Sequence, residues 1–161
     1  MSASPRPIRK YGTLSEVPAL EWAHVERRLA EAPLYWVVAP STGWAHPRPV
    51  WGIWDGQLLC VSLGSPSLRR DFARDDRATV HLESGTDVVI LEGRVVDADA
   101  VVPAVARYDD KYSYAYDVAA YGALLAVQPV KIVAWTAAGP AGREGFTAGG
   151  TWTFERDGIG G

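Results

Sequence analysis

The segment from Arg48 to Ser84 limits the possible folds most, because it places a strand, a tight turn, a strand, a capped helix and a strand in direct succession. Asp55-Gly56 lies between two apolar runs and is typical of a two-residue β-hairpin turn. Ser65 can cap a helix that has Pro66 at its first position. The pattern therefore predicts a hairpin followed by a short helix from Pro66 to about Arg74.

The rest of the chain predicts a mainly β domain with helices inserted between antiparallel strands. We expect strands over residues 34–39, 44–54, 57–63, 78–84, 87–96, 130–136 and 151–154, and a second helical region over 99–112. An earlier helix is expected to be capped by Thr13 or Ser15 and to end near Ala32. The glycine-rich stretch 137–150 reads as a loop, and residues 1–12 as a flexible arm before a single domain over 13–157. This order favours a six- to seven-stranded Greek-key split barrel over a doubly wound sheet.

Composition excludes several classes of protein. A length of 161 residues with 48% hydrophobic residues suits one domain with its own core. The net charge of -3 argues against a nucleic-acid partner, since such proteins are usually strongly basic. The one cysteine, Cys60, excludes an intrachain disulfide and fits the reducing cytoplasm. No apolar run approaches the ~18 residues that span a bilayer, so we expect no membrane partner.

The residues that most often bind metals or attack substrates are not arranged for either role. His24, His46 and His81 do not have metal-ligand spacing with Cys60 or with one another, so no metal site is expected. A G-x-S-x-G nucleophile motif is missing from the sequence, so hydrolase chemistry has no support.

The predicted helix start has the features of an anion site. Unpaired N–H groups there, together with Ser67, Arg69 and Arg70, suit a phosphate monoester. The alternative is an ordinary capped helix with both arginines in solvent, which the pattern alone favours. The spacing of Arg70 and Arg74 brings two like charges together, which costs roughly 0.2–0.5 kcal/mol unless an anion or acid neutralises them.

Two further segments have both a functional and a structural interpretation. Arg48-Pro49-Val50-Trp51 offers extended backbone and an aromatic ring to a planar heterocycle, or is an edge strand protected by proline and charge. The run from Asp109 to Asp117 places tyrosines at alternate positions. These rings would line a substrate pocket or pack against a dimer partner, and the sequence leaves both open.

In their order and spacing these residues resemble the pyridoxamine-5'-phosphate-oxidase-like family, whose fold is the flavin-binding split β-barrel. The resemblance covers nearly the whole chain after Gly12 and is firmest over Arg48–Gly52, Val61–Gly64, Ser67–Arg70 and Val80–Ser84. It implies a homodimer that holds FMN, or the related deazaflavin cofactor, at its interface. The implied cofactor-binding residues are Arg48, Pro49, Val50, Trp51, Ser62, Leu63, Ser67, Leu68, Arg69, Arg70 and, from the other subunit, Trp152.

The resemblance implies an oxidoreductase that transfers a hydride between the cofactor and a small organic substrate, without a dedicated catalytic acid or base. Tyr112 or Tyr114 is the expected proton source. Residues 154–158 do not reproduce the Arg-Leu-His-Asp-Arg segment of true pyridoxamine-phosphate oxidases, so vitamin B6 oxidation is not expected. The alternatives are a non-catalytic flavin- or haem-binding protein, with His46 or His81 as axial ligand, and a barrel whose site has decayed at Leu63.

We expect Arg69→Ala and Arg70→Ala each to weaken cofactor binding, because a hydrogen bond to a charged group contributes roughly 1.5–3 kcal/mol. The measurement is the dissociation constant of FMN or the deazaflavin for each variant. Unchanged affinity in both variants would place the phosphate elsewhere.

Overall fold

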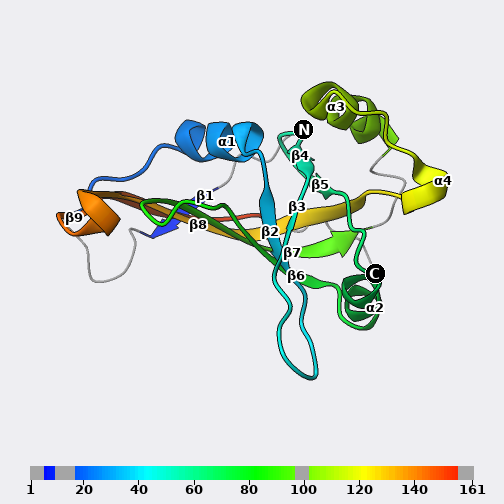
Figure 1. Ribbon diagram of the computed structural model, residues 1–161. Helices are drawn as coiled ribbons and strands as arrows, with labels where there is room; N and C mark the ends of the chain where they lie inside the picture. Colours follow the sequence, from blue (N-terminus) through cyan, green and yellow to red (C-terminus); the bar gives the residue numbers. More distant parts are fainter. Residues whose placement is uncertain (1–5, 10–16, 97–101, 156–161) are drawn as a thin grey trace.

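The computed structural model describes residues 6–9, 17–96 and 102–155, which form one nine-stranded sheet with antiparallel strand pairs (Figure 1). The strands are β1 (Arg6–Arg9), β2 (Tyr35–Val38), β3 (Arg48–Val50), β4 (Gly52–Trp54), β5 (Leu59–Val61), β6 (Arg77–His81), β7 (Asp87–Val96), β8 (Leu125–Ala138) and β9 (Gly145–Thr153). The helices are α1 (Trp22–Glu31), α2 (Pro66–Arg74), α3 (Val102–Tyr112), α4 (Val118–Tyr121) and the 3-10 turn η2 (Pro140–Gly142).

The sheet closes on itself through β3 and β4, which follow one another along the chain with Trp51 between them. Hydrogen-bonded pairs run from β3 through β2, β6, β7, β8 and β5 to β4. The N-terminal part of β8, Leu125–Val127, pairs with β5, whereas its part from Lys131 onward pairs with β9. The result is a barrel from which the β8–β9 hairpin extends, and this confirms the split-barrel prediction.

Apolar side chains divide into two clusters, one inside the barrel and one under α3. Val25 and Leu29 of α1, with Leu68 and Phe72 of α2, pack onto the barrel core. Tyr108 of α3 packs with a second group that includes Ile53 and Cys60. In Figure 1, α2, α3 and α4 lie at the end of the barrel opposite the tip of the β8–β9 hairpin. Within the described ranges, no helix is long and apolar enough to cross a membrane.

Local sequence signals predicted several elements correctly. The helix from Pro66 to Arg74 and the strand at 87–96 have the predicted bounds. The predicted hairpin forms, but its turn lies one residue further along, at Gly56 and Gln57, because the N–H of Asp55 donates to the carbonyl of Leu58. The predicted strand over 44–54 is only partly correct, because residues 44–47 belong to the β2–β3 connection and the remainder is divided into β3 and β4 by Trp51. Residues 6–9 of the expected arm form β1 and pair with β9, and the rest of that arm, with Thr13 and Ser15, lies outside the described residues.

The predicted start of the first helix is wrong, because α1 begins only at Trp22. The residues before it bond to β9 instead. The N–H of Gly149 donates to the carbonyl of Pro18, and the N–H of Leu20 donates to the carbonyl of Gly149, both at 3.1 Å. This short ladder holds the chain extended over residues that the predicted helix would have included.

The predicted loop over 137–150 is also wrong, because most of it belongs to the β8–β9 hairpin. Glycine is typical of loops, but here two of the glycines are buried in a strand, where a side chain would not fit or would be covered. Gly149 and Gly150 are buried, and a Cβ on Gly150 would lie 2.6 Å from the Trp152 ring. Gly139 and Gly145, with φ of 75° and 93°, flank the turn at the hairpin tip.

We predict that Gly52→Ala destabilises the protein by about 1–3 kcal/mol, the usual cost of an overpacked core. A Cβ at Gly52 would lie 2.7 Å from the carbonyl oxygen of Cys60 and 2.8 Å from Cγ1 of Val61. Urea unfolding measures the loss. Gly43→Ala is the control, since a Cβ there would meet nothing within 4 Å, and an equal effect of both substitutions would contradict the prediction.

Candidate functional site

The tyrosine pocket is a hollow of about 350 Å³ lined by uncharged, mostly aromatic side chains from three parts of the chain. Its lining residues are Trp51, Ser62, Gly64, Tyr108, Tyr114, Tyr116 and Tyr121. The first three follow β3 and β5, and the tyrosines come from α3, the connection after it and α4. The barrel thus brings Trp51 and Ser62, two of the predicted cofactor residues, against a wall of phenol rings.

Trp51 lies at the break between β3 and β4 with its ring partly exposed. Its indole stacks on Tyr112, with ring centroids 4.6 Å apart and an interplanar angle of 5°. The ring of Tyr114 meets Trp51 edge-on at 5.8 Å. The carbonyl of Trp51 accepts a 2.9 Å hydrogen bond from the N–H of Ser62, which ties the break to the end of β5. The indole is therefore held in a fixed plane with 40% of its residue surface exposed.

The end of α3 holds this break in place through the backbone of Gly52. The Tyr112 hydroxyl accepts a hydrogen bond from the N–H of Gly52 at 2.9 Å, and it donates to the carbonyl of Gly52 or of Pro33. The Lys111 ammonium donates to the carbonyls of Ala32 and Gly52, at 2.7 and 2.9 Å, and to the Tyr35 hydroxyl. α3 thereby fixes both the strand break and the ring that stacks beneath Trp51.

The start of α2 lies at the rim of the tyrosine pocket, because Gly64 lines the pocket and Ser65 caps the helix. The Ser65 hydroxyl accepts from the N–H of Leu68 and lies 2.9 Å from the Ser67 hydroxyl. Pro66 occupies the first turn, as predicted. N–H groups at a helix start carry partial positive charge and suit an anion.

The side chains of Arg69 and Arg70 in α2 lie in different environments. The Arg69 guanidinium donates to three backbone carbonyls, those of Leu63, Tyr121 and Ala123. Arg70 is exposed and makes no hydrogen bond or ion pair with any described residue. Of the two predicted phosphate ligands, Arg70 is therefore the one whose guanidinium could bind an anion without first breaking hydrogen bonds.

The other predicted residues are divided between the surface and the core. Arg48 and Pro49 are exposed on β3, Val50 is half-buried, and the Arg48 guanidinium donates to the carbonyl of Pro47. The side chains of Leu63 and Leu68 are buried in the core, and their backbone groups bond to Arg69 and Ser65 respectively. Of the predicted cofactor residues, Trp51 and Ser62 are the ones that line the tyrosine pocket.

Trp152 is not brought to the tyrosine pocket. It is 3% exposed and packs in the protomer's own core, with its ring centroid 5.5 Å from that of Trp22. Neither His46 nor His81 lines the pocket. His46 is exposed in the β2–β3 connection, and His81 stacks on Trp36.

The sequence predicts only half of the tyrosine wall. Tyr114 and Tyr116 belong to the run from Asp109 to Asp117, and both line the pocket. Tyr108 and Tyr121 also line it, but they lie just outside that run. Their helices follow β7 in sequence, so only the folded chain shows that they face Trp51.

Burial changes the acid-base behaviour of this region. It raises the pKa of Tyr108 and of Tyr116, and the phenols stay protonated at neutral pH. The pKa of Tyr114 is raised mainly by a hydrogen bond with Tyr121 and to a smaller extent by burial. Burial of the Lys111 ammonium among neutral oxygens lowers the pKa of Lys111 to about 8. The pocket is thus an uncharged surface with hydroxyl groups that can donate hydrogen bonds.

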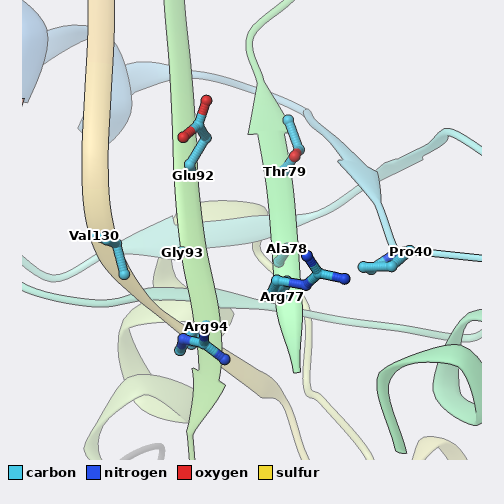
Figure 2. A pocket seen from close by; sticks show the side chains of 8 residues that line it. All are labelled: Pro40, Arg77, Ala78, Thr79, Glu92, Gly93, Arg94 and Val130. Carbon is cyan, nitrogen blue, oxygen red and sulfur yellow. The ribbon is translucent and has the colours of Figure 1, made fainter. Parts of the chain in front are cut away.

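A second hollow of about 380 Å³ lies on the outer face of β6 and β7 (Figure 2). Arg77 and Arg94, which stand opposite each other in the ladder, line it with Thr79 and Glu92. Its charges are already paired, since Arg77 bonds to Asp75, Arg94 to Asp76, and Glu92 to Lys131. None of the predicted site residues lies there, so the tyrosine pocket is the better candidate site.

The closed barrel and its extended hairpin define a split β-barrel, and known structures share this fold. No protein-family model and no curated protein matches the sequence. A solved putative 5-nitroimidazole antibiotic resistance protein from Bacteroides thetaiotaomicron matches with a TM-score of 0.61 and 10% identity, over 94% of each chain.

Two further solved structures carry enzyme names. A putative pyridoxamine 5'-phosphate oxidase from Listeria innocua has a TM-score of 0.53 and 13% identity, over 70% of this chain and 92% of its own. An F420 reductase has a TM-score of 0.50 and 18% identity, over 66% of this chain and 94% of its own. The chain therefore has the split β-barrel fold of these proteins, as the sequence resemblance predicts.

We predict that Lys111→Met costs more stability near pH 10.5 than below pH 8. The folded protein lowers the pKa of Lys111 from 10.5 to about 8, so between these values the unfolded chain binds more protons and the stability of the wild type rises with pH. The methionine variant lacks this rise. Urea unfolding at several pH values measures the difference, and a loss that stays constant with pH would contradict the prediction.

Proposed function

We propose that this protein binds a flavin-type cofactor, FMN or a deazaflavin, and transfers a hydride between it and a small organic substrate. The observation that carries the proposal is the tyrosine pocket, where Trp51 and the start of α2 meet at one hollow. A planar ring and a phosphate are the two ends of such a cofactor. The pocket offers a partner for each end, Trp51 for the ring and the start of α2 for the phosphate.

The pocket fits the ring system. Its volume of about 350 Å³ lies in the usual range of small-molecule sites, roughly 300–1,000 Å³, and aromatic rings dominate its walls. Offset stacking on an indole stabilises a flat conjugated ring by about 0.5–1.5 kcal/mol beyond the buried area. The protonated Tyr108 phenol could donate a hydrogen bond to a carbonyl oxygen at the edge of such a ring, whereas the Tyr116 hydroxyl already donates to the carbonyl of Gly122.

The phosphate would lie at the start of α2. The N–H and hydroxyl groups of Ser67, with Arg70, which is unpaired among the described residues, would supply donors and positive charge. Within the described part of the chain, the Arg48 guanidinium bonds only to the carbonyl of Pro47, and it would approach the ring or the chain that links the ring to the phosphate. Leu63 and Leu68 would contribute backbone atoms only.

The bound cofactor would supply the hydride, and the residues of the pocket would orient it and exclude water. Arg48 would stabilise negative charge on the reduced ring. The Tyr112 hydroxyl is bonded to backbone of Gly52 and Pro33, whereas Tyr114 lines the pocket. Tyr114 is therefore the better proton donor of the two predicted tyrosines.

The fold neighbours support both cofactors, since an F420 reductase and a putative pyridoxamine 5'-phosphate oxidase share the barrel. A haem is less well supported, because His46 and His81 lie away from the pocket. The pocket mouth has exposed rings, with Tyr121 at 51% and Trp51 at 40%. We include in the proposal a second copy of the chain that covers these rings and completes the site as a homodimer.

We predict that the purified protein binds FMN or the deazaflavin cofactor at micromolar concentration, with a shift in the cofactor's absorption spectrum. Trp51→Ala should weaken binding about tenfold, because it removes the stacking surface. Trp44→Ala is the matched control, since Trp44 is 88% exposed in the β2–β3 connection. Absence of binding by the wild type, or an equal loss in both variants, would sink the proposal.

A further inference from the structure

Arg69 holds the segment that closes the tyrosine pocket. Its Nε donates to the carbonyl of Leu63 at 2.6 Å, and its Nη2 donates to the carbonyls of Tyr121 and Ala123 at 2.9 and 3.4 Å. Only Nη1 has no acceptor among the described residues. The guanidinium therefore joins the end of β5 to the end of α4, two segments more than fifty residues apart in sequence.

The chain around Tyr121 is shaped to receive this guanidinium. Gly122 adopts a φ of 77°, a conformation that favours glycine, and a Cβ there would lie 3.3 Å from Nη2 of Arg69. Its carbonyl accepts a 2.9 Å hydrogen bond from the Tyr116 hydroxyl. Three successive carbonyls, from Tyr121 to Ala123, are thus bound by Arg69 or Tyr116, and this fixes the outer wall of the pocket.

We propose that Arg69 is a positioning residue, which holds Tyr121 and Tyr116 in the wall that receives the cofactor ring, and that it is not chiefly a phosphate ligand. This inference rests on the proposed function, because it assigns the ring to the tyrosine pocket. It also gives the two adjacent arginines separate roles. Arg69 would act on the ring through α4, and Arg70 on the phosphate directly.

A lysine could not replace Arg69 in this role. The planar guanidinium reaches Leu63 with one nitrogen and the α4 carbonyls with another, whereas a lysine has a single nitrogen at its tip. If Arg69 served as a positive charge for phosphate, Arg69→Lys would keep most of the affinity. If it is a positioning residue, lysine should restore little.

The test compares riboflavin, which has the ring without phosphate, with FMN. We expect Arg69→Met and Arg69→Lys to weaken both ligands by about tenfold, and Arg70→Met to weaken FMN alone. If deazaflavin is the preferred cofactor, its phosphate-free form replaces riboflavin. Arg74→Met on the same helix is the matched control, because its side chain is 66% exposed and lies outside the pocket lining.

Loss of FMN binding with unchanged riboflavin binding in Arg69→Met would overturn the positioning role and leave the proposed function intact. Failure of the wild type to bind any of these compounds would instead overturn the proposed function.

Hydrogen exchange tests the contact between Arg69 and the end of α4 without any ligand. We expect Arg69→Met, and not Arg74→Met, to speed exchange at the α4 amides of Tyr121 and Gly122, which bond to Asp117 and Val118. Unchanged exchange there would overturn the inference.

Discussion

The close packing of Gly52 against the β5 backbone is the constraint on which the rest of the site depends. Because no side chain separates them, β4 lies directly against β5 while the preceding residue, Trp51, turns its ring outward. Tyr112 and Lys111 bond to both polar atoms of the Gly52 peptide units and keep this break from relaxing. The barrel closes through the same break. The residue that permits closure therefore also sets the plane of the indole at the candidate site.

The walls of the site come from segments with little else in common. β3 and the turn after β5 supply Trp51 and Ser62, and α3 and α4 supply the tyrosines. Arg69 connects these two sides through carbonyls of Leu63 and Tyr121. Stacking on Tyr112 and hydrogen bonds to backbone atoms thus hold an uncharged aromatic surface in shape. An uncharged pocket with a helix start at its rim suits a ligand that is flat at one end and anionic at the other.

Local signals predicted the elements that depend on local chemistry. The hairpin turns where Gly56 adopts a φ of 101° and the Asp55 carboxylate accepts from the N–H groups of Gln57 and Leu58, and Pro66 begins α2 because its φ is already helical. The errors arose where distant partners decide. Pro18 pairs with Gly149 instead of starting a helix, and Gly150 packs under Trp152 in a strand. For the site, the sequence identified Trp51, Ser62 and the α2 start. It could not show that Tyr108 and Tyr121 line the same pocket, nor that the Arg69 guanidinium donates hydrogen bonds to backbone carbonyls.

The central claim is that the ring and phosphate of a flavin-type cofactor occupy the tyrosine pocket and the start of α2. A crystal structure of the protein with FMN or the deazaflavin cofactor tests it most directly. We expect the ring stacked against Trp51 within the tyrosine wall and the phosphate within hydrogen-bonding distance of the N–H and hydroxyl groups of Ser67. A cofactor bound elsewhere, such as in the hollow between Arg77 and Arg94 in Figure 2, would contradict it.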